Sequence, residues 1–182
     1  MSRQTSLALL RGINVGGKNV LPMKDLVQVF VDAGCSDVRT YIQSGNVIFR
    51  APLRVLPGLP VGITSRIAER FGYQIPVVLR TAAQLAEAIA SNPFLESGAN
   101  LKPLHVMFLA DAAGAQAIAK LDPNRSPPDR FMVRNSEIYL HLPNGAGTTK
   151  LTNGYFDSKL ATVSTGRNWA TVLKLLELMQ AP

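Results

Sequence analysis

The sequence has few of the side chains on which metal, redox and acid–base chemistry depend. Its 182 residues include one cysteine and two histidines. An internal disulfide is therefore excluded, and a zinc site of cysteine and histidine has too few ligands. We expect no metal and no bound cofactor. Acidic residues number 12 against 19 Lys and Arg, which gives a net charge of +7. This balance favours polyanions, anionic metabolites or acidic surfaces as partners, although many soluble proteins have a positive net charge without binding any of these.

Long apolar runs are missing as well. Stretches such as residues 106–110 are far shorter than the ~18 residues that a membrane span needs. Arg11 interrupts the apolar residues 7–10 too early for a secretory signal. With 47% hydrophobic and 17% charged residues, the chain is too apolar for disorder and long enough to bury a core. We expect a cytoplasmic globular protein without a membrane partner. The sequence does not determine the oligomeric state, and we slightly favour a monomer.

Residues 1–80 carry the signals of one ferredoxin-like subdomain. Pro22 suits the first turn of a helix, apolar residues then recur at helical spacing, and Gly34 suits its end. The order βαββαβ is the split-βαβ pattern. The expected elements are a strand at 6–11, a helix from 22 to before 34, hairpin strands at 37–43 and 47–50, a loop through Pro52, Pro57 and Pro60, a helix ended by Gly72, and a strand at 75–80.

Residues 104–182 repeat this order less cleanly, after a connecting helix and linker at 81–103. Thr81 and Gln84 form a capping box for the connecting helix. The sequence predicts an α+β protein of two ferredoxin-like (βαββαβ) subdomains with a C-terminal helix, consistent with a diverged duplication. The expected elements are a strand at 104–110, a helix at 112–121, hairpin strands at 131–134 and 138–142, a helix near 150–160, a strand at 161–164, and a last helix from Trp169 capped by Asn168.

The segment Gly12-Ile13-Asn14-Val15-Gly16-Gly17-Lys18-Asn19 nearly matches the phosphate loop G-x-x-x-x-G-K-[ST]. Asn19 replaces the hydroxyl residue that holds magnesium, and Val20-Leu21-Pro22 delays the helix that should begin at the lysine. These departures disfavour a nucleotide triphosphatase. Exposed glycine N–H groups beside Arg11 and Lys18 can instead form an anion-binding nest. The alternative is a flexible connection with solvated charges.

Two later junctions between a loop and a helix also carry a basic residue. The segment 145–150 ends in Lys150, with Thr148 or Thr149 as the expected helix cap, so it can hold an anion or be a simple capped turn. It lacks the third glycine and the acidic residue of the dinucleotide fingerprint. Arg167 offers a planar fork for phosphate or carboxylate, and an internal ion pair explains it equally well. The spacing of Trp169 favours the core.

The remaining candidates give weaker signals. Residues 41–46 mix an aromatic ring with hydrogen-bonding groups, but residues 47–50 do not match the motif with which RNA-recognition domains stack bases. His105 and His141 lie in apolar strands and are expected to be core or edge histidines. They could be neighbours on adjacent strands, without the further ligands of a metal site. Cys35 follows a helix C-terminus, whose partial negative charge raises a thiol pKa, so an activated nucleophile is not expected.

Three segments resemble a known family. They are Leu9-Leu10-Arg11-Gly12-Ile13-Asn14-Val15-Gly16-Gly17-Lys18-Asn19, Val38-Arg39-Thr40-Tyr41-Ile42-Gln43-Ser44-Gly45-Asn46-Val47, and residues 165–169. Together they resemble the bacterial domain of unknown function 1697 (DUF1697) over nearly the whole chain. The resemblance implies two ferredoxin-like α/β subdomains. It brings no established activity, substrate or cofactor, so no catalytic residue is carried over. Gly166 departs from the Thr or Ser-like residue common in the last motif, which weakens a ligand role there.

The leading hypothesis is an anion-binding module for a nucleic-acid backbone or a phosphorylated metabolite. It requires that the two glycine loops share one face, with Arg39 among the converging basic residues. One alternative is a cofactor-independent enzyme acting on a phosphorylated or carboxylated small molecule, for which no general base is evident. Another is a protein-interaction scaffold with an exposed strand edge. The candidate ligand-binding residues are Arg11, Asn14, Gly16, Gly17, Lys18, Tyr41, Ser44, Asn46, Lys150, Arg167 and Asn168.

Overall fold

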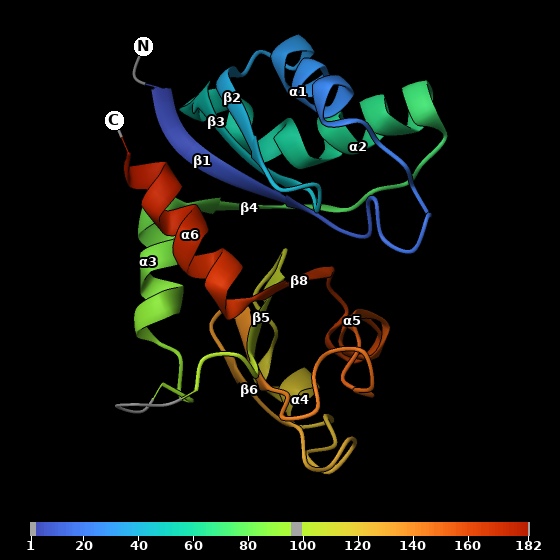
Figure 1. Cartoon of the computed structure of the whole chain (residues 1–182), viewed down its shortest axis with the longest axis vertical. Coiled ribbons are helices and arrows are strands. Elements are labelled where there is room, and N and C mark those ends of the chain that lie inside the picture. Colours follow the sequence, from blue (N-terminus) through green and yellow to red (C-terminus); the bar gives the residue numbers. More distant parts are fainter. Residues whose placement is uncertain (1–2, 96–99, 182) are drawn as a thin grey trace. The chain divides into compact units, whose positions relative to one another are not determined.

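The computed structural model describes residues 3–95 and 100–181. The chain divides into two compact units, of which the first comprises Met1–Leu85 with Leu175–Pro182 and the second Ala86–Lys174. Each unit contains one four-stranded sheet (Figure 1). The boundaries expected from the sequence, at 1–80, 81–103 and 104–182, stay a prediction.

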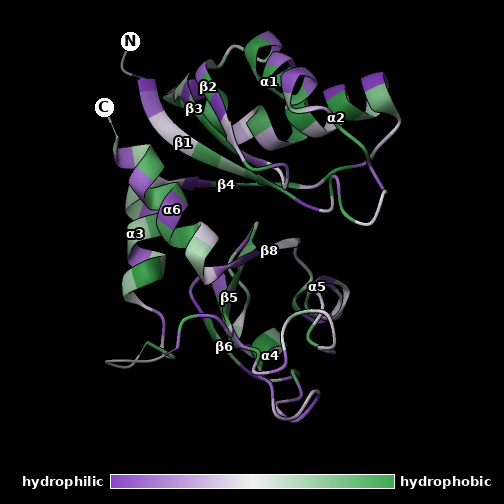
Figure 2. Ribbon diagram, viewed as in Figure 1, coloured by the Kyte–Doolittle hydropathy of each residue, from purple (hydrophilic) through white to green (hydrophobic). Residues whose placement is uncertain are grey.

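The first unit has the predicted ferredoxin-like order. Its strands lie in the order β2-β3-β1-β4, and all neighbouring pairs are antiparallel. Helices α1 and α2 cover one face of this sheet (Figure 1), and hydrophobic and hydrophilic residues alternate along both helices (Figure 2). The elements are β1 (Arg3–Leu10), α1 (Met23–Asp32), β2 (Ser36–Tyr41), β3 (Asn46–Pro52), a 3₁₀ helix (Leu53–Gly58), α2 (Leu59–Phe71) and β4 (Val77–Thr81).

The core of the first unit lies between its sheet and these two helices. Phe30 of α1 and Phe49 of β3 are fully buried, with ring centroids 5.3 Å apart. Gly72 ends α2 with a φ of +76°, as the sequence predicts. The predicted loop at residues 52–60 is wrong in part. Residues 53–58 form the 3₁₀ helix, and Pro60 lies in the first turn of α2, where its missing N–H costs no hydrogen bond.

The second unit repeats the first in its strand order, β6-β7-β5-β8, again with antiparallel neighbours. In both units a helix follows the fourth strand directly along the chain. The remaining elements of the chain are α3 (Ala82–Ala90), β5 (Leu104–Leu109), α4 (Ala115–Ile118), β6 (Arg130–Arg134), β7 (Glu137–His141), α5 (Asn153–Leu160), β8 (Ser164–Asn168) and α6 (Trp169–Gln180), of which α3 and α6 belong partly to the first unit.

Three boundaries in the second unit differ from the prediction. The alanine-rich helix is shorter than residues 112–121, because the chain leaves it after about one turn to bring Leu121 into the core. Helix α5 begins late, because the side chain of Thr152, not Thr148 or Thr149, accepts the capping bond from the N–H of Tyr155. The expected strand at 161–164 lies too early, since residue 161 has a φ of +53° and ends α5.

The predicted caps of α3 and α6 are confirmed. Oγ1 of Thr81 accepts the N–H of Gln84 at 3.2 Å, and Oε1 of Gln84 accepts the N–H of Thr81 at 2.9 Å. Asn168 accepts the N–H of Thr171 at 2.8 Å and so caps α6. Trp169 is 1% exposed, as its helical spacing predicts. Among the described residues, no helix is long and apolar enough to cross a membrane.

Candidate functional site

The glycine loop that follows β1 is a small hairpin and does not open a helix. The N–H of Asn14 donates to the carbonyl of Asn19 at 3.2 Å, and the N–H of Lys18 donates to that of Val15 at 3.1 Å. The two residues between Val15 and Lys18 are glycines with φ of +57° and +73°. Positive φ at both central positions is the backbone of a type I′ hairpin turn. The departures from the phosphate-loop motif therefore correspond to a different local structure.

The side chain of Asn14 ties this loop to the β2–β3 hairpin. Its Oδ1 accepts the N–H of Leu21 at 2.8 Å, while its Nδ2 donates to the carbonyls of Leu21 and Gln43 at 3.0 and 3.1 Å. Both ends of the amide are thus occupied within the chain. The predicted ligand residue Asn14 has an evident structural role.

The turn of the β2–β3 hairpin packs against the same loop. Asn46 is fully buried, and its Nδ2 donates to the carbonyl of Tyr41 at 3.1 Å and to Oγ of Ser44 at 2.9 Å. The N–H of Leu10 donates to the carbonyl of Gly45 at 2.8 Å. The first two segments that carry the family resemblance therefore contact each other, and the structure brings Asn14, Ser44 and Asn46 together.

The tip of the glycine loop remains exposed at Gly16, Gly17 and Lys18. Within residues 3–95 and 100–181, the N–H groups of the two glycines donate no hydrogen bond. Arg11 is half-buried, with its N–H bonded to the carbonyl of Pro76 at 3.1 Å. Arg39 donates from Nη2 to the carbonyl of Leu178 at 3.1 Å, within the same unit. A ligand role for this tip stays a prediction.

The remaining candidates, Lys150, Arg167 and Asn168, belong to the second unit. Arg167 lies within β8, is 9% exposed, and donates from Nη1 to Oγ1 of Thr165 at 3.0 Å and to the carbonyl of Gly166 at 2.7 Å. Burial lowers the pKa of Arg167 to about 10, so it remains a cation at neutral pH. Its ligand role, like that of exposed Lys150, stays a prediction.

Cys35 is a free cysteine and is 6% exposed. Burial raises the pKa of its thiol to about 11, and the positive charge of Arg3 opposes this shift. The direction of this pKa shift agrees with the prediction, but its main cause is the removal of the thiol from water rather than the partial charge at the end of the helix.

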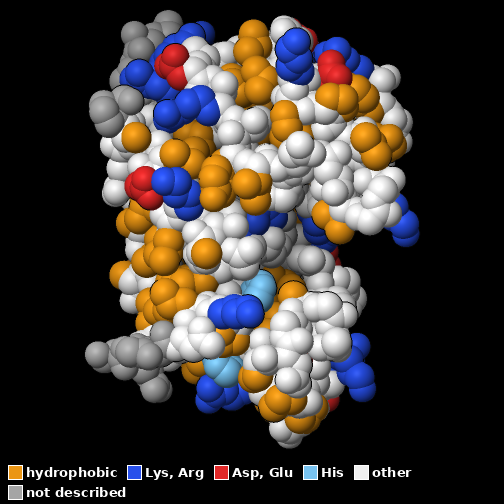
Figure 3. Space-filling view, in the orientation of Figure 1, with side chains coloured by type: hydrophobic (Ala, Val, Ile, Leu, Met, Phe, Trp, Pro, Cys, Tyr) orange, Lys and Arg blue, Asp and Glu red, His pale blue; other side chains and the backbone are white. Residues whose placement is uncertain are grey.

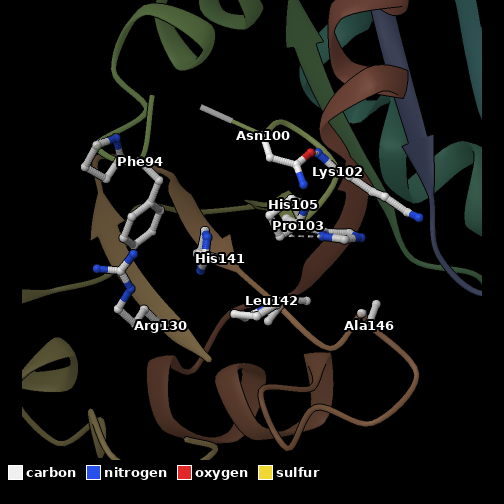
Figure 4. A pocket seen from close by; sticks show the side chains of 12 residues that line it. Phe94, Asn100, Lys102, Pro103, His105, Arg130, His141, Leu142 and Ala146 are labelled. Atoms are coloured by element: carbon white, nitrogen blue, oxygen red, sulfur yellow. Dashed lines mark hydrogen bonds between the residues drawn. The ribbon is translucent and has the colours of Figure 1, made fainter. Parts of the chain in front are cut away.

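A cavity that the sequence did not predict as a site lies within the second unit (Figure 4). It has a volume of about 780 Å³. We call it the basic cavity, because four lining residues are Lys, Arg or His and no described lining residue is acidic. It is lined by Pro93, Phe94, Asn100, Lys102, Pro103, His105, Arg130, His141, Leu142, Pro143, Gly145 and Ala146.

One side of the basic cavity is built on the pair of strands β6 and β7. Arg130 and His141 are directly opposite each other in this pair, so both side chains leave the sheet on the same face. Cζ of Arg130 lies over the ring of Phe94, 5.3 Å from its centroid, and the ring of His141 lies 6.0 Å from that of Phe94. The N–H of Phe94 donates to Oδ1 of buried Asn92 at 2.9 Å, which fixes the segment.

The other side of the basic cavity carries Lys102 and His105, drawn beyond Pro103 in Figure 4. Nδ1 of His105 lies 3.3 Å from the carbonyl of Pro103. His105 is paired with Leu140 and His141 with Leu104, so the two histidines leave the sheet on opposite faces. Both line the cavity because β5 begins and β7 ends there. Figure 3 shows histidine side chains at the surface, each with a Lys or Arg side chain beside it.

Nδ1 of His141 is buried and has no hydrogen-bond partner among the described residues. A buried polar atom without a partner costs roughly 1–3 kcal/mol, so its environment calls for an explanation. The described residues contain no group of three or more His, Cys, Asp or Glu side chains that could hold a metal ion.

The expectation that both histidines are core or edge residues gave no hint of this cavity. A usable signal was nonetheless present in the sequence. Each histidine lies two residues from a proline, in Pro103-Leu104-His105 and His141-Leu142-Pro143. Prolines at these places mark the ends of strands, where side chains can line a cavity beyond the last paired residues.

Comparisons with known proteins agree with this architecture. The profile of a family described as "Protein of unknown function (DUF1697)" matches residues 3–139. A solved structure, that of the conserved bacterial protein SP0830 from Streptococcus pneumoniae, is similar to this chain with a TM-score of 0.71 and 19% identity. The similarity covers 98% of this chain and 100% of that one, and it supports the fold alone. No curated protein matches the sequence.

Proposed function

Because the chain belongs to DUF1697, a family of proteins of unknown function, we propose a function from geometry: the protein binds a small anionic molecule in the basic cavity. The observation that carries this proposal is the charge of the lining. Lys102 and Arg130 line the cavity with both histidines, and none of its described lining residues is acidic. Like charges gathered in one concave site attract a counter-ion, and low-dielectric walls strengthen that attraction.

The size of the basic cavity favours a small molecule over a nucleic-acid backbone. Its volume of about 780 Å³ falls within the roughly 300–1,000 Å³ of small-molecule sites. Apolar side chains such as Phe94, Leu142 and Pro143 line it together with the basic ones, as is usual in small-molecule sites. A nucleic-acid backbone is more often held along an open basic groove.

Calorimetric titration with inorganic phosphate tests the proposal, with Arg130→Ala as the decisive variant. Loss of a charge-assisted hydrogen bond costs about 1.5–3 kcal/mol, so we expect Arg130→Ala to weaken binding about 10- to 100-fold. Lys18→Ala is the matched control, since it removes a cation from the glycine loop of the first unit. If Lys18→Ala abolishes binding and Arg130→Ala does not, the site lies at the glycine loop instead.

A labelled single-stranded oligonucleotide separates the two classes of partner. We expect the protein to bind the oligonucleotide more weakly than it binds inorganic phosphate. Tight oligonucleotide binding that falls by orders of magnitude between 50 and 200 mM salt would instead identify a backbone binder.

The enzyme hypothesis gains one specific observation from the same cavity. The sequence offered no evident general base, whereas His105 and His141 line the cavity together. Imidazole is the side chain most often used for proton transfer near neutral pH. Release of inorganic phosphate from phosphate monoesters by the wild-type protein, lost in His105→Gln or His141→Gln, is the result that this second candidate predicts.

A further inference from the structure

The basic side chains of the cavity fall into two pairs, each of one histidine and one Lys or Arg. Arg130 and His141 form the first pair by direct cross-strand register. The second comprises Lys102, which precedes β5, and His105, the second residue of β5, and both line the cavity. The two histidines leave the sheet on opposite faces, where β5 begins and β7 ends, because they differ by one position in the β5–β7 register. Figure 4 draws them on opposite sides of Pro103.

Apolar residues separate the two pairs. Pro103 and Leu142 lie between them in Figure 4, and both line the cavity. A single compact anion, such as one phosphate, would satisfy one pair and leave the other without a counter-ion. A longer molecule with an anionic group at each end would engage both pairs and cover the apolar middle.

Within the part of the chain that the structure describes, neither pair is neutralised by an acidic side chain. Lys102 and Arg130 form no ion pair there. Nδ1 of His141 is buried without a partner. The guanidinium of Arg130 lies over the ring of Phe94, which orients it without using its charge on a carboxylate.

The equivalent place in the first unit behaves differently. Arg50 of β3 lies opposite Ser36 of β2, as His141 of β7 lies opposite Arg130 of β6. Nη1 of Arg50 lies 3.8 Å from Oδ2 of Asp37, so Arg50 has an acidic partner within the first unit. The second unit has thus placed two cationic or ionisable groups where the first unit has one Arg, one Ser and a neighbouring carboxylate.

We propose that the basic cavity contains two anion subsites, Arg130 with His141 and Lys102 with His105, and that its ligand is a small molecule with an anionic group at each end. Phosphate is a group that both a guanidinium and an ammonium bind. This inference rests on the proposed function, since it divides the same cavity into two.

A series of α,ω-alkanediol bisphosphates with three to eight carbons, each compared with its alkyl monophosphate, tests the inference by calorimetry. Joining two anions makes the second contact intramolecular. At the best length we therefore expect the bisphosphate to bind about 100-fold more tightly than the monophosphate. Inorganic phosphate should bind with a stoichiometry of two.

Variants of the two subsites sharpen the test. Arg130→Ala and Lys102→Ala should each reduce the affinity of the best bisphosphate to nearly that of a monophosphate, and each should lower the phosphate stoichiometry from two to one. Arg50→Ala is the matched control, because it removes a cation from the equivalent strand position of the first unit. It should change neither quantity.

The failures of the two proposals are distinguishable. If inorganic phosphate binds once and no bisphosphate exceeds its monophosphate, the second subsite does not exist, while the anion site itself stands. If neither inorganic phosphate nor any bisphosphate binds, both proposals are wrong. If Arg50→Ala weakens binding as much as Arg130→Ala, the anions are held outside the basic cavity and the two subsites are refuted.

Discussion

At the scale of single residues, Gly45 meets the strictest local requirement of the first unit. Its φ is +78°, and a Cβ there would lie 2.8 Å from Cβ and 3.0 Å from the carbonyl oxygen of Leu10. The side chain of Leu10 is fully buried, and the carbonyl belongs to the backbone of β1. Neither atom can move away without a shift of the strand.

Gly45→Ala should therefore lower the free energy of unfolding by about 2–4 kcal/mol, by adding a steric clash to the ~1–2 kcal/mol cost of the left-handed backbone. Urea denaturation measures this loss. Gly17→Ala is the matched control, since Gly17 also has positive φ but has no atom within 4 Å of a Cβ. Gly17→Ala should lower the free energy of unfolding only by the cost of the left-handed backbone, about 1–2 kcal/mol. Equal losses in the two variants would mean that the contact with Leu10 is unimportant.

The thiol of Cys35 gives stability a dependence on alkaline pH. Burial raises its pKa in the folded protein from 9.0 to about 11. The unfolded chain therefore loses this proton first, and the stabilising contribution of the protonated thiol is complete below pH 9 and lost as the pH rises toward 11.

Urea denaturation between pH 8 and 11 should show the unfolding free energy of wild type falling more steeply than that of Cys35→Ala. The difference between the two proteins isolates the thiol from the lysines and tyrosines that also titrate in this range. A thiol reagent should react slowly with native protein and quickly in urea. Parallel stability curves for the two proteins would show that Cys35 titrates alike in both states.

At the scale of helices and strands, the sequence predicts what depends on neighbours along the chain. Helix α1, the end of α2 at Gly72, and the capping box of Thr81 and Gln84 agree with the structure, because periodicity and capping are local. The short α4 and the late start of α5 were missed because both involve contacts distant in sequence: Leu121 packs in the core, and the N–H of Lys150, before α5, donates to Oγ of Ser126.

The candidate sites follow the same division. The sequence identified the glycine loop because its residue types form a motif, yet the contacts of Asn14 with Leu21 and Gln43 give that motif an evident structural role. The basic cavity was missed because its residues come from the segment before β5, from the three strands β5, β6 and β7, and from the loop after β7. Only strand register places Arg130 beside His141.

At the scale of the whole molecule, equivalent hydrogen bonds recur in the two units, as expected of a diverged duplication. The first strand of each unit is bonded to the turn before its third strand, from Leu10 to Gly45 and from Leu109 to Ser136, both at 2.8 Å. The fourth strand of each unit carries a buried arginine one residue before its last. These are Arg80 and Arg167, and each donates to the preceding carbonyl.

Helix α6 contributes to both units, since its residues up to Lys174 belong to the second and those from Leu175 to the first. Val172 and Leu175 are both fully buried. Shortening either side chain to alanine should cost about 2–4 kcal/mol, with the larger loss at Leu175. Because the two residues belong to different units, we expect the losses to appear in different sheets.

Native-state hydrogen exchange resolves this expectation, since it reports local opening amide by amide. Leu175→Ala should speed exchange in β1, β3 and β4 more than in the second sheet, and Val172→Ala should speed it in β5, β7 and β8 more than in the first. The two variants control for each other, because they lie three residues apart on one helix. Equal acceleration of both sheets by either variant would mean that the units open as one cooperative body, so that a ligand in the basic cavity of the second unit would stabilise the first unit as well.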